Sequence, residues 1–565
     1  MMKIFERGVV LQERRETNYL RGASILLIAS LLVKIASAVY KIPLFNIMDY
    51  VGIGTFQVTY NVFTLILTIS TAGIPTALSR LVASANGRGN RTLVNRYFSV
   101  AMPSFILIGL AAMSIMFFFA DSLAGFMNSP LAAYGIRVLS PAVFFACIIS
   151  VYRGYAQGHE NMVPTAMSQL IEVTCKVIIG IAVAIFLSNR NYPSHIVSAG
   201  AIVGVTIGLG LVVPVLVWYK RKMVRTSPVK DSSNSEVIPS SGSLFARIMK
   251  VSIPITLTMA FISINTVVSN SIVIGRLQSV FGLTESEALT QYAAVALGTP
   301  IINITYALIV PIAISIVPAI AAAIAKGQHK EAGTIMQSSL KIVNLVAMPA
   351  AAGIMALAAP ILMTLYHHDL QISVTILIML GATSFFVNLQ YITTSMLQAN
   401  GFERTTLITF PIGILINIVL SFVLSANPNI GILATPIGML ACFIVISMLN
   451  ISFIIARVKN RPKFSKVFIR PLLCSVAMAC ACFGIFTLVS ELNIISALSE
   501  LFSGSLNFSF ALSEQLSNGL FLLLAVIVGV TVYGFLIVVS KTITMDDMKL
   551  VPKGAKIAKL LKIRH

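Results

Sequence analysis

The chain has 565 residues, of which 57% are hydrophobic and only 10% are charged, whereas soluble globular proteins carry roughly 25% charged residues. So few charges cannot cover a water-facing surface, which excludes a soluble globular protein and predicts a chain mostly surrounded by lipid. The formal net charge of +21 comes without an aromatic–basic nucleic-acid motif, so we assign the basic residues to the membrane and not to RNA or DNA.

Apolar runs long enough to cross a bilayer recur along the chain. A helix needs about 20 apolar residues to cross the hydrocarbon core, and the runs predict an all-α polytopic membrane protein with about fourteen transmembrane helices. In chain order the predicted spans are 22–44, 53–79, 98–120, 134–155, 163–187, 196–219, 250–274, 292–324, 338–365, 371–398, 405–425, 431–456, 468–490 and 516–540.

The first run also resembles a secretory signal, because Ala36-Ser37-Ala38 matches an A-x-A cleavage site. Against cleavage, Lys34 interrupts the region before that site, and the apolar run continues beyond it to Phe45. Cleavage would also leave an odd number of spans and upset the charge pattern of the loops. We therefore expect this segment to be the first transmembrane helix.

Basic residues are concentrated in the loops on one side of the predicted membrane. Nearly all of the 40 Lys and Arg residues fall in every second loop, and the positive-inside rule places those loops and both termini in the cytoplasm. The exceptions are Lys41, Arg137, Arg190 and Arg276 at the outer ends, and Lys34 and Lys176 inside spans. We expect the basic tail 541–565 either to lie on anionic inner-leaflet lipids or to be a solvated tail.

A polar, Ser- and Pro-containing segment at 220–249 predicts a cytoplasmic linker between two lobes. Phe144-Phe145 is followed by Gln157, and Phe385-Phe386 is followed by Gln398 at the same spacing, which indicates that spans four and ten are equivalent. Such a repeat places the substrate path between the lobes. The predicted order is a cytoplasmic N-terminus (1–21), an N-lobe (22–219), the linker, a C-lobe (250–456), two further helices (457–540) and the tail.

Two segments carry a family resemblance. Residues 74–82 (IPTALSRLV) resemble the end of the second helix of oligosaccharide flippases, and residues 152–164 (YRGYAQGHENMVP) resemble the junction of the fourth and fifth helices in one branch. That branch contains the MurJ-like lipid II flippases and the stage V sporulation protein B group, and the similarity covers nearly the whole chain. The resemblance implies the fold of the multidrug/oligosaccharidyl-lipid/polysaccharide exporter superfamily. It also implies a bacterial plasma-membrane location and export of an undecaprenyl-diphosphate-linked sugar, in peptidoglycan or polysaccharide synthesis, cell shape or sporulation.

Ionisable side chains inside a span cost about 2.5–3.5 kcal/mol each on insertion scales, and they usually face a cavity and serve a function. Lys34 lies near the middle of the first helix, and Lys41 follows two turns later on the same face. A line of cations at two depths suits a diphosphate that moves between leaflets. The alternative for Lys34 is a lysine that snorkels to the interface.

Glu172 and Lys176 lie four residues apart on one face of the fifth helix. This order favours a pair whose charges cancel, which would lower the cost of insertion. Alternatively, Lys176 helps to hold an anionic headgroup while Glu172 exchanges a proton or binds a monovalent cation.

The family resemblance adds roles for some of these residues. In MurJ-like flippases, cationic residues of the first helix line the central cavity, and Lys34 stands where Gram-negative relatives have an arginine. This chain departs from those relatives in spans 53–79 and 292–324, which contain no base. If the mechanism is shared, Arg276 or Lys176 would substitute for the missing arginines.

Six further polar residues are candidate substrate contacts. Arg80 and Arg153 lie at cytoplasmic helix ends, where they are either ordinary positive-inside residues or contacts for a phosphate at the gate. Asn265 is expected either to form hydrogen bonds with sugar hydroxyls or to form hydrogen bonds between helices. The same alternatives apply to Asn270, Asn303 and Asn388.

No catalytic or cofactor constellation is present in the sequence. The six histidines are scattered, the six cysteines form no CxxC pair, and there is no Walker A motif. We therefore predict a transporter without a cofactor or metal, driven by an ion gradient, the membrane potential or consumption of its substrate.

The sequence thus predicts an alternating-access flippase for an undecaprenyl-diphosphate-linked, lipid II-like precursor. The alternatives are a multidrug or cation antiporter of the same fold, a flippase for another lipid-linked repeat unit, and a membrane glycosyltransferase or polymerase. The last would be expected to carry acidic catalytic residues on large outer loops, and only segment 491–515 is long enough.

Overall fold

The computed structural model describes residues 29, 31–33, 35–37, 39–226, 239–366, 371–458, 462, 464–491, 510–540 and 542. Within these ranges the regular structure is helical, and thirteen helical segments are long and apolar enough to cross a membrane. They coincide with thirteen of the predicted spans, which confirms the all-α polytopic fold class. Of the remaining predicted span, 22–44, the structure describes residues 29, 31–33, 35–37 and 39–44, and these are helical.

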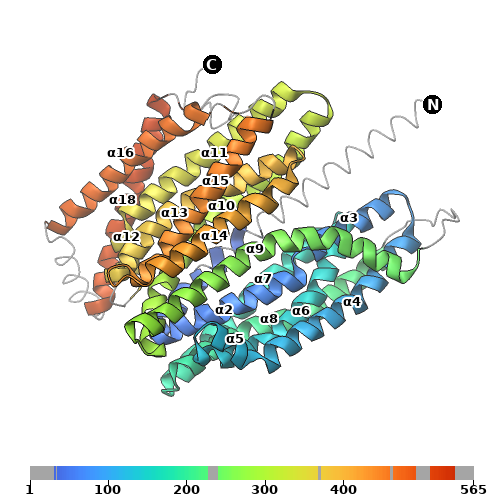
Figure 1. Cartoon of the computed structure of the whole chain (residues 1–565), viewed down its shortest axis with the longest axis horizontal. Coiled ribbons are helices and arrows are strands. Elements are labelled where there is room, and N and C mark those ends of the chain that lie inside the picture. The colour runs from blue at the N-terminus through green and yellow to red at the C-terminus, as the bar shows by residue number, and fades with distance from the viewer. Residues whose placement is uncertain are drawn as a thin grey trace. The chain divides into compact units, whose positions relative to one another are not determined.

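The chain divides into two compact units, residues 1–290 and 291–565 (Figure 1). Unit 1 contains α2 (Tyr50–Thr71), α3 (Ile74–Gly87), α4 (Arg91–Phe118), α5 (Ala120–Phe126), η1 (Pro130–Ala132), α6 (Ala133–Gly158), α7 (Val163–Asn189), α8 (Ser194–Thr226), α9 (Ser241–Phe281) and the start of α10 (Glu285–Ala325). Unit 2 contains the rest of α10, α11 (His329–Ala356), α12 (Ala358–Leu365), α13 (Gln371–Ala399), η2 (Glu403–Thr405), α14 (Thr406–Leu424), η3 (Gly431–Leu433), α15 (Ala434–Arg457), α16 (Phe464–Glu491) and α18 (Phe510–Val539).

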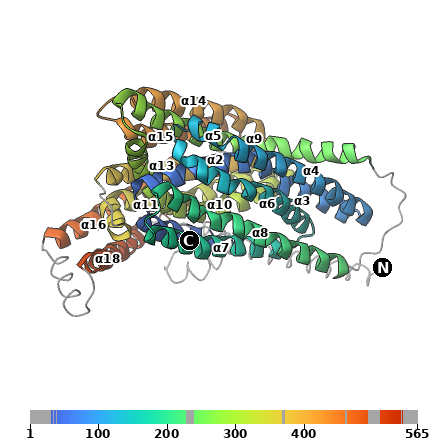
Figure 2. The same cartoon turned by 90° about the horizontal axis from the view of Figure 1, so that it is seen from below.

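The two units repeat one packing order. In unit 1, α4 packs on α6, α6 on α8 and α8 on α7, and Figure 2 shows these helices side by side. In unit 2, α11 packs on α13, α13 on α15 and α15 on α14. The paired phenylalanines 144–145 and 385–386 lie on the corresponding helices α6 and α13. The packing therefore supports the internal repeat, while α16 and α18 add a helix pair to unit 2 through α11 and α12.

Helix α9 packs on α2, α3 and α4 of unit 1, although the sequence suggested that it begins the second lobe. The contact is close where α2 ends and α3 begins. The Gly73 amide donates to Thr256 Oγ1 at 3.1 Å, and a Cβ at Gly73 would lie 2.2 Å from the Ser252 carbonyl oxygen. Glycine is thus required for this crossing, and the lobe boundaries remain a prediction.

The far end of α9 is fastened to the turn between α5 and η1. Asn128 adopts a positive φ of 53°, its Nδ2 donates to the Ser271 carbonyl at 3.0 Å, and its own carbonyl accepts from Gln278 Nε2 at 2.7 Å. At the start of α10, Glu285 Oε1 accepts from the Leu131 amide at 2.8 Å. Hydrogen bonds therefore hold α9 to the preceding helices of unit 1 at Thr256 and again near its C-terminal end.

We predict that Gly73→Ala lowers the free energy of unfolding by about 1–3 kcal/mol, because the added Cβ overpacks the crossing with α9. Gly87→Ala is the matched control, since a Cβ there meets nothing within 4 Å. Thermal unfolding of both variants in detergent provides the measurement. Equal melting temperatures for the two variants would show that the crossing is not tight.

Candidate functional site

Two buried lysines of unit 1 flank the ring of Tyr60. Lys41 is 9% exposed and Lys176 is 7% exposed. Lys176 Nζ donates to the Tyr60 hydroxyl at 3.2 Å and lies 5.0 Å from the centroid of its ring. Lys41 Nζ lies 5.7 Å from the centroid of the same ring. The two ammonium groups therefore share one aromatic partner.

Polar and aromatic side chains complete this lysine pair. Lys41 Nζ donates to Gln57 Oε1 at 3.2 Å, and Gln57 Nε2 donates to Asn61 Oδ1 at 3.1 Å. On the other side, Lys176 Nζ lies 5.1 Å from the centroid of the Tyr40 ring. Each cation–π contact contributes about 0.5–2 kcal/mol, which offsets only part of the cost of burying a charge.

The local sequence explains how these side chains meet. Residues 39–47 are helical, and Asp49 then caps α2 by accepting the Gly52 amide at 2.8 Å. The chain reverses at this cap, so Lys41 comes to lie against the first turns of α2. Helix α7 supplies Lys176, and it approaches α8 so closely that a Cβ at Gly180 would lie 2.6 Å from the Ala201 carbonyl oxygen. That same carbonyl accepts the Tyr40 hydroxyl at 3.2 Å, which fixes the ring beside Lys176.

The lysine pair has no neutralising acid among the described residues. The ion pairs in that part of the chain are Arg137–Asp121 and Arg153–Glu172, and neither includes Lys41 or Lys176. Two ammonium groups that are buried against the same ring repel each other. A bound anion would relieve this repulsion, so the arrangement is suited to a ligand that carries at least one negative charge.

Glu172 pairs with Arg153 of α6 and not with Lys176, so the self-neutralising pair, one of the two interpretations of this motif, does not form in this structure. An Arg153 terminal nitrogen lies 3.2 Å from Glu172 Oε2, and Arg153 Nε donates to Ser168 Oγ at 2.8 Å. Ser168 and Glu172 are four residues apart on α7 and together hold the guanidinium fork. Lys176 instead extends to Tyr60, because the hydroxyl and two rings surround it there.

The other predicted residues lie elsewhere. Lys34 falls outside the described residues. Arg80 is exposed on α3, Arg276 is half-buried near the far end of α9, and Asn265 is buried within α9. The structure therefore brings together Lys41 with Lys176, and Arg153 with Glu172.

Sequence reasoning missed Tyr40, Tyr60, Gln57 and Asn61. One signal was available: Gln57 and Asn61 are polar residues four positions apart in an otherwise apolar run, which places them on one helix face. The contact of Gln57 with Lys41 required knowing where the chain reverses. The aromatic partners of Lys176 carried no distinguishing pattern.

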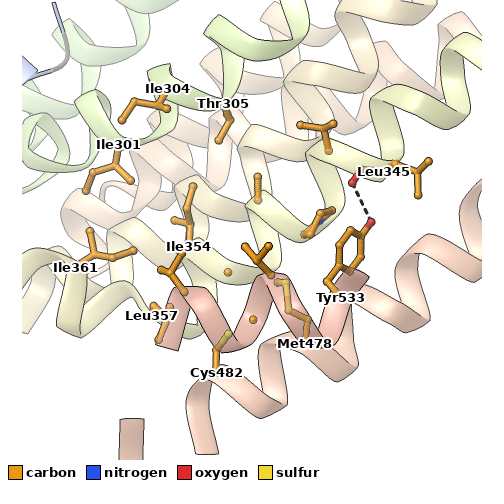
Figure 3. A pocket seen from close by; sticks show the side chains of 17 residues that line it. Ile301, Ile304, Thr305, Leu345, Ile354, Leu357, Ile361, Met478, Cys482 and Tyr533 are labelled. Carbon is orange, nitrogen blue, oxygen red and sulfur yellow. Dashed lines mark hydrogen bonds between the residues drawn. The ribbon is translucent and has the colours of Figure 1, made fainter. Parts of the chain in front are cut away.

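Unit 2 contains an apolar pocket of about 530 Å³ between α10, α11, α12, α16 and α18 (Figure 3). Its wall is almost wholly aliphatic or sulfur-containing and includes Ile301, Ile354, Met478 and Cys482. The polar edge is Tyr533, whose hydroxyl donates to the Leu345 carbonyl at 2.9 Å, as Figure 3 shows. Such a pocket can accept a hydrocarbon chain and offers little to a polar ligand.

Comparisons with known proteins agree with this architecture. The family described as "Polysaccharide biosynthesis protein" matches residues 19–323, and the family described as "MatE" matches residues 254–423. "Lipid II flippase MurJ" of Bacillus subtilis (strain 168) is 26% identical over 448 residues, which cover 75% of this chain and 81% of that protein. "Stage V sporulation protein B" of the same organism is 25% identical over 446 residues, which cover 77% of this chain and 83% of that protein.

Solved structures with the same fold include both flippases and drug transporters. "Lipid II flippase MurJ, inward closed conformation" has a TM-score of 0.61 at 18% identity and covers 92% of this chain and 97% of that chain. The inward-facing conformation of a multidrug resistance MATE family transporter has a TM-score of 0.60 at 16% identity, covering 77% and 98%. The relatives and structural neighbours of this chain are membrane flippases and transporters and not enzymes. The "Polysaccharide biosynthesis protein" family model matches more than half of the residues of this chain, and the chain therefore belongs to that family.

Proposed function

We propose that the protein is an alternating-access flippase that exports an undecaprenyl-diphosphate-linked cell-wall precursor, similar to lipid II, from the inner to the outer leaflet of the bacterial plasma membrane. The observation that carries this proposal is the lysine pair around Tyr60. Two cations buried together without an acid are suited to an anionic headgroup and unsuited to a cationic drug.

The polar contacts of the lysine pair suit the headgroup of such a lipid. A diphosphate carries charge on two phosphorus centres, so Lys41 and Lys176 can each take one. Gln57 offers an amide group beside Lys41, and Asn61 offers a second amide next to Gln57. Amides bond the hydroxyls of sugars as both donors and acceptors. We assign Lys41 and Lys176 to the diphosphate, and Gln57 and Asn61 to the groups next to it.

The lipid part of the substrate suits the apolar pocket of unit 2. Burial of each CH₂ group contributes about 0.8 kcal/mol, so a few isoprenoid units would bind there appreciably. The almost unbroken apolar lining favours a hydrocarbon chain over a polar drug. We assign the pocket to part of the polyprenyl tail.

The Arg153–Glu172 ion pair is the proposed coupling element. Each group is partly exposed, with 19% and 32% of the two side chains accessible, so protons or monovalent cations can reach the carboxylate. Protonation of Glu172, or binding of a cation to it, would release Arg153 to contact a phosphate. A membrane potential of 100 mV is worth about 2.3 kcal/mol for each charge moved, which is enough to bias such a cycle.

A multidrug or cation antiporter is the second candidate, because the fold is shared with drug transporters. The lysine pair argues against it, since buried cations repel the positively charged compounds that these proteins usually export. A flippase for another lipid-linked repeat unit shares the diphosphate and makes the same use of the lysines.

We predict that Lys41→Gln and Lys176→Gln each reduce translocation of the lipid-linked precursor at least tenfold, because each removes a charge that faces the diphosphate. The control is Lys330→Gln, which removes an exposed basic residue at the start of α11. The measurement is the amount of precursor accessible at the outer leaflet of cells that depend on the variant. Undiminished translocation by both lysine variants would contradict the assignment.

We also predict that Gly353→Phe slows transport of the full-length polyprenyl substrate by filling the pocket. Gly353 lines the pocket, and a Cβ there would meet only Met478 Cε at 3.7 Å, so the variant should fold. Gly484→Phe is the control, because a Cβ at Gly484 meets nothing within 4 Å and the residue is not part of the lining. A short-chain analogue should be transported equally by both variants. Equal transport of the long-chain substrate would remove the pocket from the proposal.

Finally, we predict coupling between Arg153→Gln and Glu172→Gln. Each single variant leaves a partly buried charge without its partner and should lower the free energy of unfolding. The double variant should lose about 0.5–3 kcal/mol less than the sum of the losses of the two single variants. Thermal unfolding of the three variants gives this coupling energy. Strictly additive losses would mean that the ion pair contributes nothing.

A further inference from the structure

Tyr60, the aromatic residue shared by the two lysines, is held rigidly but remains partly open to its surroundings. Its ring stacks on Phe56 with a centroid distance of 5.7 Å and an interplanar angle of 15°, and it meets Phe63 edge-on at 5.7 Å. Lys41 and Lys176 are buried, as are both phenylalanines, whereas Tyr60 is partly exposed. The ring therefore has a fixed orientation, and a ligand can reach it.

The hydroxyl of Tyr60 uses only part of its hydrogen-bonding capacity. A phenol can donate its own hydrogen and can also accept one at its oxygen. The oxygen accepts from Lys176 Nζ at 3.2 Å. Among the residues that the structure describes, none accepts the hydrogen of this hydroxyl. One donor in the middle of the lysine pair is thus available to a ligand.

Tyr40, the other tyrosine beside Lys176, shows a different pattern. Its hydroxyl donates to the Ala201 carbonyl at 3.2 Å, and the residue is only 1% exposed. The two rings lie at nearly equal distances from Lys176 Nζ, 5.1 Å for Tyr40 and 5.0 Å for Tyr60. The hydroxyl of Tyr40 is therefore satisfied within the protein, and the two tyrosines differ in whether their donor is used.

The surroundings of the Tyr60 hydroxyl suit it to an anionic acceptor. Because Lys176 donates into the phenol oxygen, it polarises the O–H bond and makes that group a stronger donor. Hydrogen bonds to anionic oxygens are roughly twice as strong as those between neutral groups. A lysine ammonium acts as a point charge on a flexible stem, whereas a ring packed against two phenylalanines directs its hydroxyl to one place. The hydroxyl thus adds direction to the charge of the lysines.

We propose that Tyr60 is a specificity-determining residue of this site, whose hydroxyl donates a hydrogen bond to a phosphate oxygen of the bound lipid diphosphate. The inference rests on the proposed function, because the diphosphate is the ligand assigned to Lys41 and Lys176. In this arrangement the lysines supply the attraction for negative charge. Tyr60 selects an anion with an acceptor oxygen at the position that its fixed ring dictates.

The test measures the affinities of the purified full chain for undecaprenyl diphosphate and for undecaprenol, and the readout is the ratio of the two. Tyr60→Phe keeps the ring between the lysines and removes the hydroxyl, so we expect the ratio to fall about tenfold. The control is Tyr192→Phe, which removes the hydroxyl of a 47% exposed tyrosine between α7 and α8. This control should leave the ratio unchanged.

A second variant separates donation to the phosphate from support of Lys176. Tyr60 is replaced by 3-fluorotyrosine, whose electron-withdrawing fluorine makes the hydroxyl a stronger donor and a weaker acceptor. The measurement is made at slightly acidic pH, so that the phenol keeps its proton. If the hydroxyl donates to the phosphate, the affinity ratio is maintained or raised. If the hydroxyl only accepts from Lys176, the ratio falls, and the proposal is overturned.

The outcomes also distinguish this inference from the proposed function. A full affinity ratio in Tyr60→Phe, together with a lost ratio in Lys41→Gln, would overturn the role of Tyr60 and leave the flippase proposal intact. An unmodified chain that binds both lipids equally would overturn both. A ratio that falls in Tyr60→Phe and is maintained or raised by fluorination would support the hydroxyl as a direct phosphate donor.

Discussion

Unit 1 buries positive charge in an apolar helical environment, with no acid beside it among the residues that the structure describes. Lys41 and Lys176 are both buried, and they are held by one tyrosine, a second aromatic ring and an amide. These contacts fix the ammonium groups but leave the charge uncompensated. Close packing of α7 on α8 and the helix reversal at Asp49 maintain that arrangement. A protein that only needed to fold would gain stability by replacing both lysines with apolar residues.

The same reasoning separates two charged clusters of unit 1. The lysine pair is buried without an acid among the described residues and is suited to a ligand. Arg153 and Glu172 neutralise each other within the protein, so this pair needs no ligand to balance its charge. Their burial and their partners, and not charge alone, therefore distinguish their roles.

Much of the fold followed from hydropathy, because a bilayer allows few alternatives to helices of about 20 residues. Thirteen predicted spans coincide with helices of the structure, and the Phe-Phe pairs indicated the repeat that the packing supports. The site was harder to predict. Glu172 and Lys176 have ideal spacing for a helical ion pair, yet Arg153 from another helix is the partner of Glu172. The spacing of residues along one helix cannot show that a side chain of a neighbouring helix binds the same carboxylate. Nor can it show the chain reversal at Asp49 that brings Gln57 to Lys41.

The central claim is that Lys41 and Lys176 jointly hold a diphosphate, and binding to the purified protein tests it most directly. The affinity of an undecaprenyl diphosphate should be compared with that of undecaprenol for the unmodified chain, for each lysine-to-glutamine variant and for the double variant. The account predicts that the diphosphate lipid binds more tightly than the alcohol. It also predicts that either substitution removes most of that difference and that the two effects are not additive. Equal affinity of the unmodified chain for both lipids would contradict it.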